Sequence, residues 1–240
     1  MDPGIRSGKV TMLSLVFLFV YVAQSQAEEQ IFSSEELEQL NQGLLVTRPQ
    51  SQLKKGMFLF GGNSWQLINA KPQEVWQSLL DVERFPSIIP KTVSSELLSE
   101  HEQRRVVAIH QKGGPFDINY RIVFTVKIPG KELLFRIDSS HDGTATKAWG
   151  FFHIAPYNDR KSILSYGVLS DIGSGSVQGM IRPLLQEKLL KVPFYLKRYL
   201  ERGGKFRYTQ NLPTQHRKPK VDRSIAKLGR VFAIASKKIQ

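Results

Sequence analysis

The sequence predicts an α+β fold built from an antiparallel sheet and a long C-terminal helix. Three observations predict it. Apolar and polar residues alternate over residues 116–128, which is typical of a strand with one buried face. Shorter runs of the same kind flank this segment on both sides. Residues 176–202 then change to the spacing of an amphipathic helix. A run of strands closed by a helix is typical of the α+β class.

The composition is that of a globular protein with an uneven charge. The chain has 240 residues, of which 41% are hydrophobic, and this is enough for a substantial core. It has no cysteine, which excludes a disulfide framework, a thiol nucleophile and cysteine-ligated zinc. The formal net charge is +13, but residues 28–203 contribute +3 and residues 204–240 contribute +9. Because the body is nearly neutral, no nucleic-acid partner is expected.

The first 27 residues have the features of a secretory signal peptide. Arg6 and Lys9 precede an apolar run at residues 12–23, and Ser25 and Ala27 supply the small residues of a cleavage site after residue 27. The run is shorter than the roughly 20 residues that a membrane span requires. We therefore expect export to a periplasmic or extracellular location. The alternative is an uncleaved anchor.

Residues 28–55 are predicted to form a short helix and a linker. Ser33 and Glu36 have the spacing of a capping box, and leucines at helical spacing follow them. Gly43 suits the end of this helix. Residues 48–51, which include a proline, are interpreted as the linker.

Residues 56–203 are predicted to form the main domain. A strand at 65–69 is followed by a helix at 71–80, with a proline in its first turn. Turns are expected at 129–130 and 156–159. The remaining strands are expected at 92–98, 104–111, 116–128, 133–137, 144–155 and 162–172. Pro183 and Pro193 interrupt the closing helical pattern, so it is expected to be kinked or to consist of two abutting helices.

Two motifs in this domain are informative. The first lies in residues 68–90, and its matching positions are Ala70, Glu74, Val75, Trp76, Leu79, Asp81, Phe85, Pro86 and Pro90. The second is Gly150-x-Phe152-x-Ile154-x-Pro156, with phenylalanine where tryptophan is usual. Over residues 56–203 the sequence resembles the START-like (SRPBCC) superfamily. This superfamily includes polyketide cyclases/dehydratases, lipid-transfer domains and coenzyme Q-binding proteins.

The resemblance implies a helix-grip fold, in which a curved antiparallel sheet wraps a long C-terminal helix. A bent sheet and one helix cannot bring all their apolar side chains together, so a largely apolar cavity is expected between them. An apolar small molecule or lipid would be its ligand. The alternative is that the same side chains simply fill the core. The candidate lining residues are Trp76, Phe85, Ile118, Tyr120, Ile122, Phe124, Phe135, Ile137, Phe152, Leu185 and Leu189.

The sequence contains no clear catalytic constellation. None of the five histidines has a spacing that marks a metal ligand, and no cofactor is predicted. A cyclase would need polar groups that converge inside the cavity. The weak candidates for this role are Tyr120, His110 and Tyr166.

The basic tail, residues 204–240, contains one amphipathic pattern. Its apolar stripe consists of Val221, Ile225, Leu228, Phe232, Ala235 and Ile239. A basic amphipathic helix suits an anionic membrane surface or a groove on a partner protein. A solvated, partly disordered tail is the alternative. The residues expected to make a membrane or partner contact are Arg223, Lys227, Arg230, Phe232, Lys237 and Lys238.

Three functions are compatible with these features. The first is an exported carrier that holds an apolar molecule such as a lipid, a quinone or a polyketide-like compound. The second is a cyclase or dehydratase that acts in the same cavity. The third is an interaction module that works through the basic tail. The sequence favours the carrier, since the motifs and the aromatic inward face both point to a cavity.

Overall fold

The computed structural model describes residues 32–54, 56–113, 116–138, 140, 147–171 and 176–203. The predicted signal peptide and the basic tail lie outside the described residues, so both remain predictions. Among the residues described, no helix combines the length and apolar character that crossing a bilayer requires.

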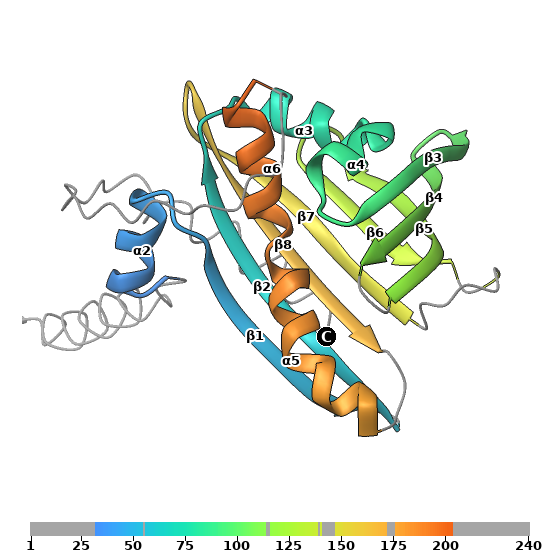
Figure 1. Ribbon diagram of the computed structural model, residues 1–240. Coiled ribbons are helices and arrows are strands. Elements are labelled where there is room, and N and C mark those ends of the chain that lie inside the picture. The colour runs from blue at the N-terminus through green and yellow to red at the C-terminus, as the bar shows by residue number, and fades with distance from the viewer. Residues whose placement is uncertain are drawn as a thin grey trace, which may run out of the picture. The chain divides into compact units, whose positions relative to one another are not determined.

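Eight strands form one antiparallel sheet (Figure 1). Their order across the sheet is β1-β2-β8-β7-β6-β5-β4-β3, so that chain-distant strands β2 and β8 are neighbours. The strands expected after residue 90 are confirmed, with β7 reaching into the expected turn. The bounds are β1 (Val46–Lys54), β2 (Met57–Ile68), β3 (Thr92–His101), β4 (Arg104–Gly113), β5 (Phe116–Ile128), β6 (Glu132–Ile137), β7 (Lys147–Asn158) and β8 (Lys161–Asp171).

The linker expected at residues 48–51 is instead part of a strand. β1 pairs along its whole length with β2, from Val46 opposite Trp65 to Lys54 opposite Met57. After Val46 every side chain of β1 is exposed, so the segment has no alternating apolar pattern by which a strand could be recognised. An edge strand also tolerates a proline at position 49. The first part of β2, before Trp65, is largely buried, and it was not recognised for a different reason: its apolar run and two glycines do not alternate between apolar and polar residues.

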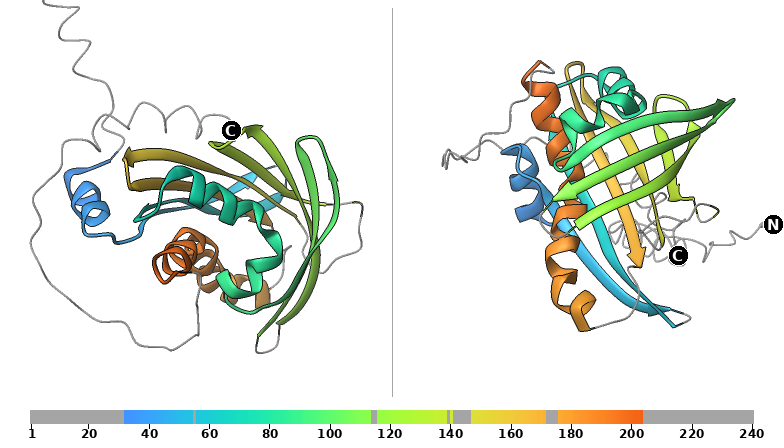
Figure 2. Two further views of the ribbon diagram at one scale, coloured as in Figure 1. Left: turned by 90° about the horizontal axis from the view of Figure 1, so that it is seen from above. Right: turned by 45° about the vertical axis from the view of Figure 1, so that its right-hand side comes forward.

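Most of the helices lie within the curve of the sheet (Figure 2). The long C-terminal helix is divided in two at Lys191, with Pro193 in the first turn of the second piece, which confirms the expectation of abutting helices. Pro183 stays inside the first piece. The helices in this group are α3 (Pro72–Leu80), the 3-10 helix η1 (Val82–Arg84), α4 (Phe85–Ile88), α5 (Ser176–Leu190) and α6 (Val192–Glu201).

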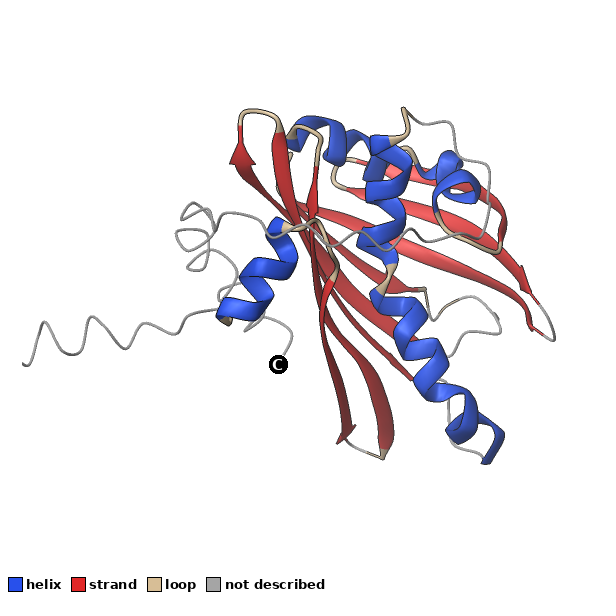
Figure 3. Ribbon diagram, turned by 60° about the vertical axis from the view of Figure 1, so that its left-hand side comes forward, coloured by secondary structure: helices blue, strands red, loops and turns tan. Residues whose placement is uncertain are grey.

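α2 (Ser34–Asn41) lies on the opposite, convex face of the sheet, as Figure 3 shows. The predicted capping box is confirmed: the Ser33 hydroxyl accepts a hydrogen bond from the Glu36 amide at 3.2 Å, and the Glu36 carboxylate accepts one from the Ser33 amide at 2.8 Å. The Phe32 ring contacts the Trp65 ring edge-on, with centroids 5.4 Å apart. The Tyr157 hydroxyl donates to Asn41 at 3.3 Å. This segment is therefore packed on the sheet.

Two polar side chains fasten the C-terminal helices to the sheet. Gln186 on α5 donates to the carbonyls of Gln50 at 2.9 Å and Gly61 at 2.7 Å, on β1 and β2. Lys197 on α6 donates to the carbonyl of Leu67 at 3.0 Å. The fold is the predicted α+β helix grip, and these bonds fix the position of its helices over the concave face.

Candidate functional site

The strand register gathers aromatic side chains on the concave face. Phe124 on β5 lies opposite Phe135 on β6, and Phe152 on β7 lies opposite Tyr166 on β8. Residues that face each other across an antiparallel pair point to the same side of the sheet. Phe85 of α4 approaches from the helical layer, with its ring centroid 6.1 Å from that of Phe124. We call these five residues the aromatic cluster.

The aromatic cluster is a continuous, tightly packed wall. The Phe135 ring has its centroid 6.4 Å from that of Phe124, 5.4 Å from that of Phe152 and 5.7 Å from that of Tyr166. All five members are buried. Each such ring pair contributes about 0.5–1.5 kcal/mol beyond the burial of its surface. Four of the predicted cavity residues are therefore part of a rigid apolar core.

The other predicted cavity residues form a half-buried border around this wall. Trp76 of α3, Tyr120 and Ile122 of β5 and Leu189 of α5 are only partly buried, and all four pack against the core. Three predicted cavity residues remain, and they too are only partly exposed and lie beside members of the border. These are Ile118, Ile137 and Leu185. The concave face thus presents large apolar side chains that the helices cover only in part.

Two tyrosine hydroxyls add polar groups to this apolar surface. Burial raises the pKa of Tyr166 and of Tyr120, and for Tyr166 the nearby Tyr120 adds to the effect, so both phenols are neutral donors. Within the described residues neither hydroxyl has a hydrogen-bond partner, and neither does the fully buried hydroxyl of Ser64, which lies opposite Tyr166. Buried polar groups are normally paired. The site is therefore suited to a molecule that brings its own acceptor.

His110 lies on the other side of the sheet from the two tyrosines. Its neighbour Ile109 is the residue opposite Tyr120, so His110 points to the convex face. There its Nε2 lies 2.7 Å from Asp117 Oδ1. Hydrogen bonds from His110 and Lys112 lower the pKa of the Asp117 carboxyl. The structure thus brings Tyr120 and Tyr166 to one face but does not bring His110 to them.

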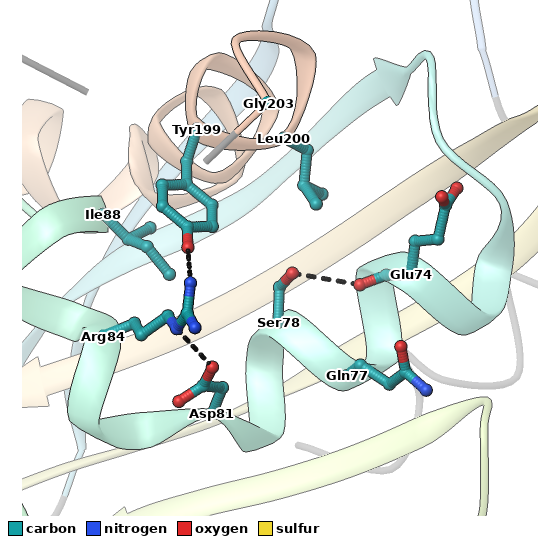
Figure 4. Close-up of a pocket in the computed structure, with 9 residues that line it drawn as sticks. All are labelled: Glu74, Gln77, Ser78, Asp81, Arg84, Ile88, Tyr199, Leu200 and Gly203. Atoms are coloured by element: carbon teal, nitrogen blue, oxygen red, sulfur yellow. Dashed lines mark hydrogen bonds and ion pairs between the residues drawn. The ribbon is translucent and has the colours of Figure 1, made fainter. Parts of the chain in front are cut away.

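A surface pocket of about 360 Å³ lies between α3, η1, α4 and the end of α6 (Figure 4). The Arg84 guanidinium is 2.7 Å from an Asp81 carboxylate oxygen and donates to the Tyr199 hydroxyl at 3.1 Å. Sequence reasoning missed this pocket, because Arg84 and Tyr199 are 115 positions apart and only the fold joins them. Its lining is Glu74, Gln77, Ser78, Asp81, Arg84, Ile88, Tyr199, Leu200 and Gly203.

The pocket is lined by the carboxylates of Glu74 and Asp81 and by the guanidinium of Arg84. It therefore suits a small polar molecule more than an apolar one. No predicted cavity residue lines it. Among the described residues, no three side chains of the metal-binding types are grouped in a way that could hold an ion.

Comparisons with known proteins agree with this architecture. The family described as "Polyketide cyclase / dehydrase and lipid transport" matches residues 68–191. A STAR-related lipid transfer protein fragment from Xanthomonas axonopodis is 14% identical with a TM-score of 0.50, covering 65% of this chain and 98% of that one. A protein from Thermus thermophilus is 13% identical with a TM-score of 0.50, covering 60% and 98% of the two chains.

The ZhuI aromatase/cyclase from a Streptomyces species is 15% identical with a TM-score of 0.49, covering 61% of this chain and 98% of that one. No curated protein matches the sequence significantly. At these identities the likeness to the solved structures concerns the fold alone.

Proposed function

The chain belongs to the polyketide cyclase/dehydrase and lipid transport family, and from this premise we propose that it binds and carries an apolar small molecule on the concave face of its sheet. The family implies ligands that are apolar small molecules or lipids. The proposed position is the half-buried border beside the aromatic cluster, to which α3, β5 and α5 contribute side chains.

The observation that carries this proposal is the incomplete burial of Trp76, Tyr120, Ile122 and Leu189. Each of these side chains still has apolar surface in contact with water. Covering ~100 Å² of such surface stabilises a complex by about 2.5 kcal/mol. A ligand that fills this border gains this energy without displacing the aromatic cluster.

The two tyrosines define the chemistry of the ligand further. Neutral phenols donate hydrogen bonds, and an apolar molecule with a carbonyl or ether oxygen supplies the missing acceptor. A lipid, a quinone and a polyketide-like compound all have such an oxygen. The proposed ligand is therefore an apolar molecule with at least one acceptor, rather than a pure hydrocarbon.

The position of His110 favours a carrier over a cyclase. A cyclase needs an acid or a base within hydrogen-bond reach of the reacting atoms. The histidine considered for that role lies on the convex face and is paired with Asp117. Tyr120 and Tyr166 alone are suited to binding and orienting a ligand.

Two probes of matched shape test the proposal. We expect 1,4-naphthoquinone to bind the full chain about tenfold more tightly than naphthalene, because a hydrogen bond contributes about 1–1.5 kcal/mol. Tyr166→Phe should reduce this preference, whereas Tyr157→Phe, on the convex face, should not. Calorimetric titration measures each affinity. If neither probe binds and no apolar compound co-purifies with the chain, the carrier function is wrong.

Recovery of the bound compound separates carrier from enzyme. The chain is incubated with a candidate ligand, the compound is extracted, and its mass is measured by mass spectrometry. A carrier returns it unchanged. A product of altered mass or ring structure would support the cyclase instead.

We also propose that residues 1–27 direct export of the chain. The support is the order of Arg6, Lys9, the apolar run at 12–23 and the small residues Ser25 and Ala27. The intact mass of the protein recovered from a bacterial periplasm or from the medium should correspond to a chain that begins at Glu28. A protein that keeps its first 27 residues and sediments with membranes would instead be anchored.

A further inference from the structure

The convex face of the sheet carries an apolar strip. Trp149 on β7 lies opposite Leu169 on β8, and Phe151 lies opposite Leu134 on β6. An antiparallel sheet with helices on one face normally presents polar side chains on the other. In this sheet the convex face carries large apolar residues as well. We call this set the convex strip, and it consists of Leu59, Val123, Leu134, Trp149, Phe151 and Leu169.

The convex strip is largely buried, although no helix of the described part of the chain covers it. Leu59 is 1% exposed, Val123 2%, Phe151 4% and Leu169 7%. α2 is the described helix on this side of the sheet (Figure 3), and its segment contacts Trp65 on β2 and Tyr157 near the end of β7, neither of which belongs to the strip. The contacts of the described helices do not account for this burial.

Two segments of the chain lie outside the described part at its ends, and their patterns differ. The run at residues 12–23 is apolar on every side, so a helix made from it would leave an apolar face in water when docked. It is also the segment that the predicted cleavage removes. Residues 221–239 have a single apolar stripe with basic residues largely away from it, which is the pattern of a helix that covers a surface and faces water.

The dimensions of the C-terminal segment fit the convex strip. A helix from 221 to 239 is about 27 Å long at 1.5 Å per residue. The strip runs from Leu59 on β2 to Val123 on β5, which is four strand spacings or ~19 Å. The connection over residues 204–220 reaches up to ~56 Å when extended. It is long enough to lead from the end of α6 around an edge of the sheet.

We propose that residues 221–239 form a helix that docks on the convex strip of the same chain. Val221, Ile225, Leu228, Phe232, Ala235 and Ile239 contact the strip, and the basic residues face the solvent. The apolar stripe of residues 221–239 is also the surface suited to a membrane. It cannot contact the convex strip and a membrane at the same time. The docked state thus hides both the strip and the membrane-binding surface.

The absence of cysteine from the chain gives a clean test of this contact. Leu169→Cys introduces one thiol on the convex strip, and Val93→Cys introduces one at a position that is 55% exposed. In the full chain a maleimide should label Leu169→Cys at least about tenfold more slowly than Val93→Cys. Adding Phe232→Glu, which places a charge in the stripe, should raise the labelling rate of Leu169→Cys about tenfold. Arg230→Glu, on the solvent side of the helix, should leave it unchanged.

Three results would overturn the proposal. The first is an unchanged labelling rate of Leu169→Cys after Phe232→Glu is added, in a double variant whose thermal midpoint is also unchanged. The second is protection that disappears on dilution, since a second copy of the chain would then be the cover. The third is full protection of Leu169→Cys while the tail holds the chain on phosphatidylglycerol vesicles, since the tail would then be on the membrane. Formation of a disulfide between Leu169→Cys and Phe232→Cys within one chain would support docking directly.

Discussion

The rings of Phe135 and Tyr166 are nearly parallel, with centroids 5.7 Å apart and an angle of 9° between their planes. Phe135 comes from β6 and Tyr166 from β8, so their stacking crosses the intervening strand β7. Phe152 of β7 lies beside both rings. The Tyr166 hydroxyl is therefore held by a packed ring rather than by a hydrogen bond.

This relationship leads to a prediction for Tyr166→Phe. The substitution keeps the stacked ring and removes a buried hydroxyl that has no partner within the described residues, so the free energy of unfolding should stay the same or rise by up to about 1 kcal/mol. Phe135→Ala, which removes the partner ring, should lower it by about 3–5 kcal/mol. Urea unfolding measures both. A loss above ~1 kcal/mol for Tyr166→Phe would mean that the hydroxyl is paired in the native state.

Gly150→Ala tests how closely the sheet packs under the aromatic cluster. An added Cβ would lie 2.5 Å from the Phe135 ring and 2.0 Å from the carbonyl oxygen of Gly167. Since the backbone cannot move away cheaply, we expect a loss of about 2–3 kcal/mol or non-folding. Gly130→Ala is the control, because its Cβ would meet nothing within 4 Å although φ is +73°. It should cost only about 1 kcal/mol. Equal losses for the two variants would contradict the close packing.

The sequence predicted the fold where the alternation of residues is determined by burial. β5 alternates because one face packs on the core, and the same alternation correctly places Phe124 and Tyr120 together. β1 could not be recognised, since an edge strand held by backbone hydrogen bonds does not need apolar side chains. The convex strip does not follow from alternation, which indicates one apolar face, because β7 carries large apolar residues on both faces. The pocket at Arg84 depends on contacts between chain-distant elements, which no local pattern records.

His153 is expected to make stability depend on pH. Its side chain is 3% exposed, and burial, with a smaller effect of the Lys131 charge, lowers its pKa from 6.5 to about 4. Between these two values the unfolded chain binds a proton that the folded chain does not, so the free energy of unfolding falls as the pH falls through this window. Above pH 6.5 this contribution is constant.

The size of the effect can be measured by urea unfolding at pH 7 and pH 4.5. The shift corresponds to a loss of roughly 2 kcal/mol between these two conditions. His153→Gln has no titrating ring. The change in its free energy of unfolding between pH 7 and pH 4.5 should therefore be smaller than that of the unmodified protein by roughly 2 kcal/mol. The same pH dependence in both proteins would show that His153 is not the group responsible.

Lys197 and Lys191 provide a matched comparison of two ion pairs in the C-terminal helices. Lys197 is 2.7 Å from Glu201, and its side chain is 15% exposed; Lys191 is 2.5 Å from Glu187, and its side chain is 40% exposed. Lys197 also donates to the carbonyl of Leu67, and Glu201 accepts from the amide of Asn69, so this pair ties α6 to the end of β2.

Lys197→Met should therefore lower the free energy of unfolding by about 1–3 kcal/mol, because it leaves the partly buried Glu201 without its cation and the Leu67 carbonyl without its donor. Lys191→Met removes a more exposed pair and should cost less than about 0.5 kcal/mol. Denaturant unfolding at low and high salt checks both values. Since added salt screens exposed charges more than buried ones, the small effect of Lys191→Met should shrink further, whereas that of Lys197→Met should persist. Equal losses in the two variants would mean that the contacts with β2 do not hold α6 in place.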